Sequence, residues 1–266
     1  MGIPVHAIMK RPGETVDQIL GGKLKIIQKE KGYRFSIDAL LLAHFVWLKK
    51  RDHLLELGTG SGVISLILAR RWCCGRVVGA EIQEDLYEMA LRNVELNRLT
   101  DQVSMIPCDV RRMETSLKAQ SFDTVVFNPP YRKMNSGRMN PDDQRAMARH
   151  EIKGTLDDFL KAAAYVLKES GRVFIIYPAA RMVELFDRMR TFHLEPKRVK
   201  IVYSHDDSEG EFILTEGRKG GREALKVLPP LFIYERTGEY SRVMTGIFSD
   251  LADRERIPQV PPGRRR

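Results

Sequence analysis

Short apolar runs alternate with helical patterns along most of the chain from about residue 52 onward. Five runs predict buried strands, because each is short, nearly continuous in apolar residues and bounded by polar or turn residues. They are "HLLELG" (53–58), "RVVGAEI" (76–82), "QVSMIPCD" (102–109), "FDTVVFN" (122–128) and "GRVFIIYP" (171–178). Segments 84–98 and 156–169 place apolar residues on one helical face. This alternation predicts an α/β fold, a parallel sheet with helices on both faces.

Two more strands are predicted at 195–205 and 210–220. The connection between them is too short for a parallel crossover, so we expect an antiparallel hairpin at the edge of the sheet. Ahead of the sheet, 24–36 is predicted to form a small hairpin around Lys31-Gly32, followed by a helix over 37–48. The expected architecture is a seven-stranded, mostly parallel sheet with an antiparallel edge hairpin and a small N-terminal hairpin and helix.

Length and composition suit one large domain with an appendage, since the chain has 266 residues and 43% hydrophobic content. We expect an N-terminal extension over 1–50, the sheet domain over 51–256 and a basic tail over 257–266. The longest apolar runs fall short of the roughly 20 residues that cross a bilayer, and no signal-peptide pattern begins the chain. A cytoplasmic protein without membrane contact is therefore expected.

The cysteines and the net charge narrow the possible partners. Cys73, Cys74 and Cys108 show no C-x-x-C spacing, so neither a disulfide framework nor a metal site is expected. The formal net charge is +9. An excess of Lys and Arg suits a polyanionic partner such as nucleic acid, although it can also serve solubility alone.

The segment "LLELGTGSGVISLIL" (54–68) reads as strand, glycine-rich turn and helix. Gly58, Gly60 and Gly62 allow a tight turn and a close ligand approach at a helix N-terminus. The alternative is a tight connection that happens to be rich in glycine. A dinucleotide fingerprint would need glycine where Val63 stands. A carboxylate at Glu56 would repel a pyrophosphate, which favours a cationic or zwitterionic ligand.

Acidic residues close three successive predicted strands. Glu81 ends the second strand, where it could accept hydrogen bonds from both hydroxyls of a ribose. Asp109 ends the third strand, where it could accept a hydrogen bond from an adenine amine. Each is equally natural as a helix N-cap. Together with Glu56 they would meet at the carboxyl edge of the sheet, which favours a single ligand site.

The fourth strand ends in Asn128-Pro129-Pro130-Tyr131. Two prolines end a strand for simple reasons, and Asn and Tyr are ordinary loop residues. With the preceding motifs, however, the sequence resembles the Rossmann-like class I S-adenosylmethionine-dependent methyltransferases of the NPPY type, which methylate exocyclic amine or amide nitrogens. The resemblance implies that the three glycines line the methionine end of the cofactor, that Glu81 takes its ribose and Asp109 its adenine. The implied catalytic residues are Asn128, Pro129, Pro130 and Tyr131. The full implied cofactor set is Phe35, Ser36, Asp38, Glu56, Gly58, Thr59, Gly60, Gly62, Glu81, Ile82, Asp109, Val110 and Asn128.

The NPPY residues suit transfer to an adenine amine, whose lone pair is delocalised into the ring. The Asn128 side-chain carbonyl and the Pro129 backbone carbonyl can accept the two amine hydrogens without a general base. Tyr131 offers a face for an extruded base, and stacking contributes roughly 1 to 3 kcal/mol per base.

Three further blocks, 21–45, 128–160 and 216–241, resemble the bacterial tRNA(Val) adenosine-37 N6-methyltransferases. This resemblance implies S-adenosylmethionine as cofactor and a tRNA as partner. Other NPPY enzymes remain alternatives: glutamine N5-methyltransferases of release factors, DNA adenine-N6 enzymes and rRNA guanine-N2 enzymes. A non-catalytic RNA-binding protein with the same fold is a further alternative, against which the intact motifs argue.

A long basic loop is predicted to follow the NPPY motif. Long loops beside an active centre are commonly functional, and this one could clamp RNA phosphates, with a solvated charged loop as the alternative. The expected RNA-binding residues are Arg132, Lys133, Arg138, Arg145 and Arg149.

Overall fold

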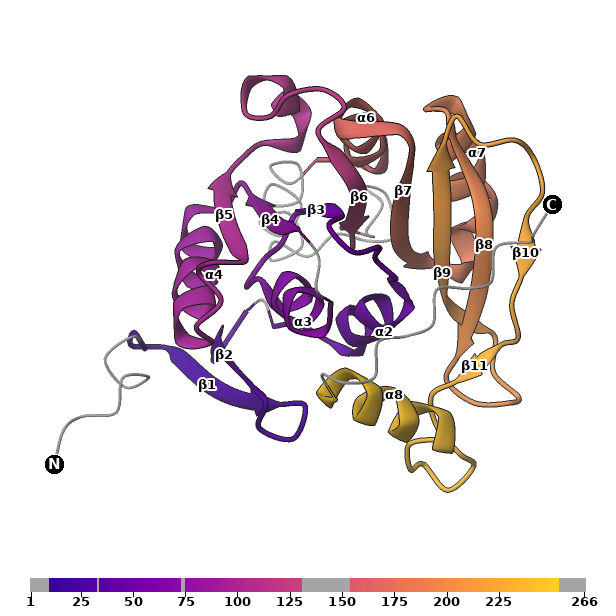
Figure 1. Cartoon of the computed structure of the whole chain (residues 1–266). Coiled ribbons are helices and arrows are strands. Elements are labelled where there is room, and N and C mark those ends of the chain that lie inside the picture. The colour runs from indigo at the N-terminus through magenta and orange to yellow at the C-terminus, as the bar shows by residue number, and fades with distance from the viewer. Residues whose placement is uncertain (1–9, 33, 73–74, 131–153, 254–266) are drawn as a thin grey trace, which may run out of the picture.

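A mixed sheet forms the centre of the protein, whose computed structural model describes residues 10–32, 34–72, 75–130 and 154–253. Its strand order is β10-β8-β9-β7-β6-β3-β4-β5, and β11 also pairs with β8 (Figure 1). The strands are β3 (His53–Leu57), β4 (Arg76–Glu81), β5 (Val103–Pro107), β6 (Phe122–Phe127), β7 (Leu167–Pro178), β8 (Leu194–Tyr203), β9 (Gly210–Lys219), β10 (Lys226–Val227) and β11 (Leu231–Phe232).

The predicted strand pattern is confirmed for the seven long strands. β3 to β7 run parallel, and β9 is antiparallel to both β7 and β8. The expected number of strands is too low, because the short strands β10 and β11 add to the outer edge of β8 in parallel. Two residues per strand give too short a pattern to be recognised in a sequence.

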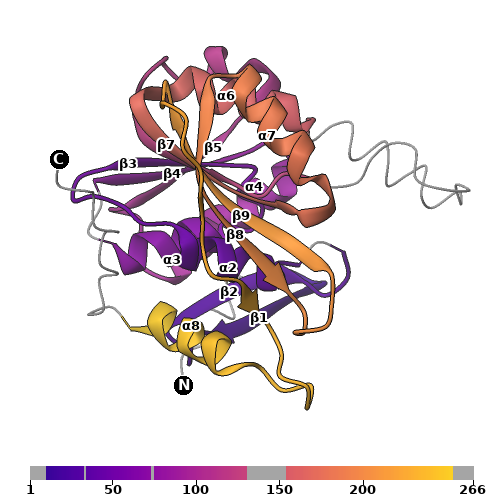
Figure 2. The same ribbon diagram turned by 90° about the vertical axis from the view of Figure 1, so that its right-hand side faces the viewer.

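Helices and apolar side chains cover both faces of the sheet. Helices α2, α3, α4 and α8 pack into the core on one face, and α6, α7 and η1 into the core on the other. Figure 2 shows α6 and α7 on one side of the sheet and α2, α3 and α8 on the opposite side. The helices are α2 (Ile37–Phe45), α3 (Val63–Arg71), α4 (Glu84–Leu96), α6 (Leu156–Val166), α7 (Met182–Thr191) and α8 (Arg242–Ala252), with 3-10 turns η1 (Val110–Thr115) and η2 (Ala179–Arg181). No helix in the described ranges is long and apolar enough to cross a membrane.

The N-terminal hairpin lies earlier in the chain than the pattern predicts. It consists of β1 (Glu14–Ile19) and β2 (Leu24–Lys29), so its turn falls at residues 20–23 and the predicted turn at Lys31-Gly32 is wrong. Gly21 and Gly22 adopt left-handed backbone angles with φ of 62° and 78°, which suits a tight hairpin turn. The predicted helices at 37–48 and 156–169 also end early, at Phe45 and Val166.

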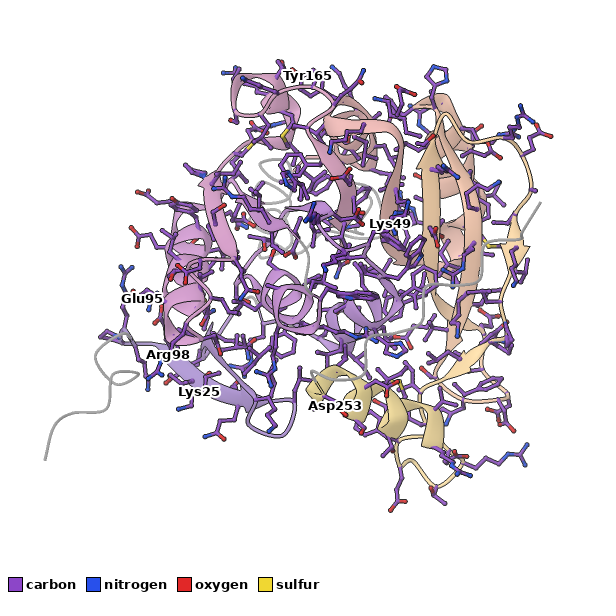
Figure 3. All side chains as sticks on the ribbon, in the orientation of Figure 1. Lys25, Lys49, Glu95, Arg98, Tyr165 and Asp253 are labelled. Atoms are coloured by element: carbon purple, nitrogen blue, oxygen red, sulfur yellow. The ribbon has the colours of Figure 1, made fainter. Side chains whose placement is uncertain are left out.

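The hairpin lies beside α4 (Figure 1). Two asparagines hold it there, Asn93 within the helix and Asn97 at its C-cap. Asn97 accepts from the backbone N–H of Lys25 at 2.9 Å and donates to its carbonyl at 2.7 Å. Asn93 makes the same pair of bonds with Ile27, at 2.6 Å and 3.0 Å. Figure 3 shows Lys25 next to the C-terminal end of α4, where Arg98 is labelled. The two side-chain amides are four residues apart, about one helical turn. Each pairs with the backbone N–H and C=O of one residue of β2, as the backbone of a neighbouring strand would.

A buried ion pair lies at the amino edge of the sheet, before β3 and within β7. The guanidinium of Arg172 bonds Asp52, Thr124 Oγ1 at 2.9 Å and the Trp47 carbonyl at 2.8 Å. It also lies 3.8 Å from the centre of the Trp47 ring. Both charged side chains are less than a tenth exposed. Burial lowers the pKa of Arg172, while Asp52 and Glu216 raise it.

Candidate active site at the carboxyl edge of the sheet

The glycine-rich turn between β3 and α3 requires its glycines. Gly58, Gly60 and Gly62 all adopt left-handed angles, with φ of 67°, 58° and 85°. A Cβ on Gly62 would lie 3.0 Å from the Cε atom of Met105, so a side chain there would also be crowded. The predicted turn is therefore present. It leads directly into the N-terminus of α3, where backbone N–H groups lack intrahelical partners.

Glu56 stabilises this turn with side-chain hydrogen bonds. Its Oε2 atom accepts hydrogen bonds from Thr59 Oγ1 at 2.6 Å, from the backbone N–H of Ser65 at 2.8 Å and from the Ser65 hydroxyl. The side chain is only 2% exposed. These contacts join the end of β3 to the first turn of α3. A direct contact between Glu56 and the cofactor stays a prediction.

The buried position of Glu56 changes its protonation. Burial raises its pKa to about 7; hydrogen bonds from Ser65 and Thr59 oppose the rise, and the charge of Glu81 adds to it. The folded state therefore binds this proton more tightly than the unfolded chain does. The contribution to stability is complete below the ordinary value of 4.5 and is lost as the pH rises to about 7.

Replacing Glu56 with Gln should remove this pH dependence. The amide oxygen can still accept the bonds now made to Oε2, and no charge has to be buried. Near pH 5 we expect similar stabilities for both proteins, whereas near pH 8 the variant should be more stable by up to about 3 kcal/mol. Urea unfolding at the two pH values measures the difference. A stability difference between the two proteins that does not change with pH would contradict the raised pKa of Glu56.

Glu81 links the glycine turn to the loop after β4. Its Oε2 atom accepts from the backbone N–H of Gly60 at 2.8 Å, and its Oε1 atom accepts from those of Ile82 and Gln83 at 3.1 Å and 2.9 Å. The N-cap of α4 is Gln83, so Glu81 is not the cap that the alternative interpretation assigned to it. Glu81 is 4% exposed and lies against the turn. Its predicted contact with a ribose is compatible with this position but stays a prediction.

Asp109 lies at the same edge, one strand further along. It caps η1 by accepting from the backbone N–H of Arg111 at 2.9 Å, so the N-cap interpretation is correct. The Arg111 guanidinium donates to both oxygens of the carboxylate, and this pairing lowers the pKa of Asp109. Val110 begins η1 and is buried. Contacts of Asp109 and Val110 with an adenine stay predictions.

Asn93 connects the glycine turn to the N-terminal hairpin, and the sequence patterns did not indicate it. Besides its bonds to Ile27, its Nδ2 atom donates to the Ser61 carbonyl at 2.9 Å. The side chain is fully buried. A signal was present in the sequence: Asn93 and Asn97 are polar residues on the apolar side of a helix, where buried amides need partners.

Asn128 follows the last residue of β6 and meets α2. Its Nδ2 atom donates to Asp38 Oδ2 at 2.8 Å, across 90 positions of sequence. The other oxygen of Asp38 accepts from the backbone N–H of Ala39 at 2.8 Å and from the Ser36 hydroxyl. The Phe35 N–H donates to Gln28 Oε1 at 3.1 Å, which ties this segment to the hairpin. The structure thus brings Ser36 and Asp38 to the end of β6.

Several predicted residues lie outside the described residues. They are Tyr131, Arg132, Lys133, Arg138, Arg145 and Arg149, together with Cys73, Cys74 and the basic tail at 257–266. Within the described ranges, no cluster of three or more His, Cys, Asp or Glu side chains could hold a metal ion.

Comparison with known proteins identifies the family of the chain. The methyltransferase domain family matches residues 48–220. A tRNA1(Val) (adenine(37)-N6)-methyltransferase from Porphyromonas gingivalis is 33% identical over 194 residues, covering 71% of this chain and 75% of the relative. The chain belongs to this methyltransferase family. The enzyme of the same name from Shewanella halifaxensis is 26% identical to our methyltransferase over 234 residues, covering 82% and 92% of the two chains.

The solved structures show the same fold. A predicted O-methyltransferase from Agrobacterium tumefaciens superimposes on the methyltransferase with a TM-score of 0.65 at 20% identity. The match covers 80% of this chain and 96% of the other. The class I methyltransferase fold expected from the sequence is thereby confirmed.

Proposed function

We propose that the methyltransferase transfers the methyl group of S-adenosylmethionine to the exocyclic N6 atom of an RNA adenine, namely adenosine 37 in the anticodon loop of tRNA(Val). The observation that carries the proposal is the position of Asn128 and Pro129 at the end of β6, on the carboxyl edge that also holds the glycine turn. The names of the relatives support the substrate.

The residues of the carboxyl edge fit this cofactor. The left-handed glycines leave room for close approach to the backbone, and the carboxylate of Glu81 suits a ligand that carries an ammonium and a sulfonium charge. Glu81 and Asp109 close neighbouring strands, as a ribose and an adenine in one extended ligand require. When bound, S-adenosylmethionine supplies an electrophilic methyl group.

The residues of the chain act on the amine that receives the methyl. The side-chain carbonyl of Asn128 and the backbone carbonyl of Pro129 accept hydrogen bonds from its two N–H groups. These bonds draw the nitrogen toward tetrahedral geometry and make its lone pair available. Pro129 and Pro130 restrict the backbone and so hold both acceptors in place. The Glu56 and Glu81 bonds keep the glycine turn in a fixed shape before any ligand arrives.

Nucleoside mass spectrometry tests this function. Unmodified tRNA(Val) is incubated with the protein and isotopically labelled S-adenosylmethionine, then digested. We expect labelled N6-methyladenosine at position 37, and no label in a tRNA in which that adenosine is replaced by guanosine. Labelled N5-methylglutamine in a release factor, with none in the tRNA, would favour the glutamine enzymes. Failure to bind the cofactor would favour a non-catalytic RNA-binding protein.

The basic residues after the NPPY motif should contribute to RNA affinity through phosphates. Replacing Arg132, Lys133 and Arg138 with Gln should weaken tRNA binding and flatten its dependence on salt. Each lost phosphate contact is expected to lower the slope of log affinity against log salt concentration by about 0.7 to 0.9. Filter binding at several salt concentrations measures the slope. An unchanged slope would place the RNA surface elsewhere.

A further inference from the structure

We propose that Asp38 is a positioning residue that sets which end of the Asn128 amide faces the substrate amine. The inference rests on the proposed function, since it assigns a role within transfer to an amine. It goes further by naming a residue outside the NPPY motif that controls the acceptor in that motif.

The contacts of Asp38 explain why the orientation is set. An ionised carboxylate only accepts hydrogen bonds, so the group that Asn128 turns toward it has to be its NH2 end. The Asn128 Nδ2 atom donates to Asp38 Oδ2 at 2.8 Å, and Asp38 is 8% exposed. By covalent geometry the carbonyl oxygen of the amide then lies at the opposite end, away from Asp38.

Asp38 is itself held in place. Its other oxygen accepts from the Ala39 N–H and the Ser36 hydroxyl at the start of α2. Helix α2 is anchored in the core by Leu41 and Leu42, which are almost fully buried. The carboxylate therefore has a fixed direction before a substrate binds.

The orientation matters because the two ends of an amide have nearly the same shape and opposite hydrogen-bonding character. With its carbonyl toward the substrate, Asn128 accepts a hydrogen from the amine. After a half turn it would present N–H donors to an amine that is also a donor. No bond would form, and the nitrogen would lose one of its two acceptors.

Replacing Asp38 with Asn should reverse the amide of Asn128. The Ala39 N–H and the Ser36 hydroxyl are donors, so they will keep the oxygen of the new amide and leave its NH2 group facing Asn128. Asn128 then has to offer its oxygen to that group. We expect kcat to fall at least tenfold, with the cofactor Kd and the KM for tRNA each changed by less than about threefold.

Exchanging the two residues should restore activity. With Asp38→Asn and Asn128→Asp together, the new amide donates to one oxygen of the new carboxylate, whose second oxygen can accept from the substrate. We expect at least a tenfold recovery of kcat over Asp38→Asn alone. Asn128→Asp alone should be poorly active, because two carboxylates would then face each other. Asp85→Asn at the start of α4 serves as the control and should retain wild-type kcat, since that carboxylate pairs only with Lys29 and the N-terminus of its own helix in the described residues.

A spectroscopic readout separates this inference from the proposed function. The side-chain amide resonances of Asn128 in a 15N-labelled protein should be shifted and slow to exchange in the wild type, and should change in Asp38→Asn while Asp85→Asn leaves them unaltered. Unchanged Asn128 resonances would overturn the inference. So would a double exchange that recovers nothing while cofactor affinity falls in step with kcat, because Asp38 would then act on the cofactor directly. A wild type that shows the expected resonances but methylates no adenine would refute the proposed function alone.

Discussion

Replacing Asn128 with Ala is expected to lower kcat for adenine methylation at least a hundredfold. The variant removes one of two acceptors aimed at the amine, and loss of a single aligned hydrogen-bonding group at a reacting centre commonly costs 10²- to 10³-fold. Affinity for S-adenosylmethionine should stay within about threefold, because the glycine turn is braced by Glu56 and Glu81 and makes none of its described bonds to Asn128.

Single-turnover methylation and calorimetric titration of the cofactor measure the two quantities separately. Circular dichroism and thermal unfolding control for misfolding, since the variant also removes a partner of the buried Asp38. Equal losses of cofactor affinity and rate would mean that Asn128 shapes the pocket rather than the reaction. A rate close to that of the wild type would refute the mechanism.

Replacing Asp52 with Ala is expected to destabilise the protein by about 3 to 5 kcal/mol, because the buried Arg172 guanidinium loses the carboxylate that bonds it. Glu216, another acidic group that acts on Arg172, is already paired with Arg198. The carboxylate of Asp52 also accepts from the Lys49 N–H at 2.7 Å, so the turn into β3 loses a bond as well. The midpoint of thermal unfolding should fall by about 10 °C for a chain of this size. Methyl transfer at low temperature should persist, because the pair lies at the edge opposite the site.

An exposed pair of the same kind provides the control. Asp206 and Arg236 bond at 2.8 Å, but the arginine is 84% exposed. Asp206→Ala should therefore shift the unfolding midpoint little, since water already solvates both charges. Similar effects of the two substitutions would mean that burial does not set the strength of the Asp52 pair.

Elements with strong periodicity were predictable, and short or ambiguous ones were not. The apolar runs of β3 to β9 and the amphipathic α4 and α6 appear in the predicted order and regions, although α6 ends at Val166, earlier than predicted. The N-terminal hairpin was misplaced because Lys31-Gly32 and Gly21-Gly22 are both plausible turns. The choice depends on which register buries Leu24 and Ile26 in the core cluster that also holds residues of α3 and α4, and that burial involves residues far away in the chain.

The carboxyl edge shows the same division between local pattern and long-range contact. Strand ends, the glycine turn and the NPPY motif are local features, so the chain alone indicates that Glu56, Glu81, Asp109 and Asn128 gather at one edge of a parallel sheet. How these side chains are used is a matter of packing. Glu56 is buried and bonds within the turn itself. Contacts between distant segments join Asp38 to Asn128 and Asn93 to Ser61. Such pairings depend on which side chains meet once the core has formed, and no spacing along the chain encodes them.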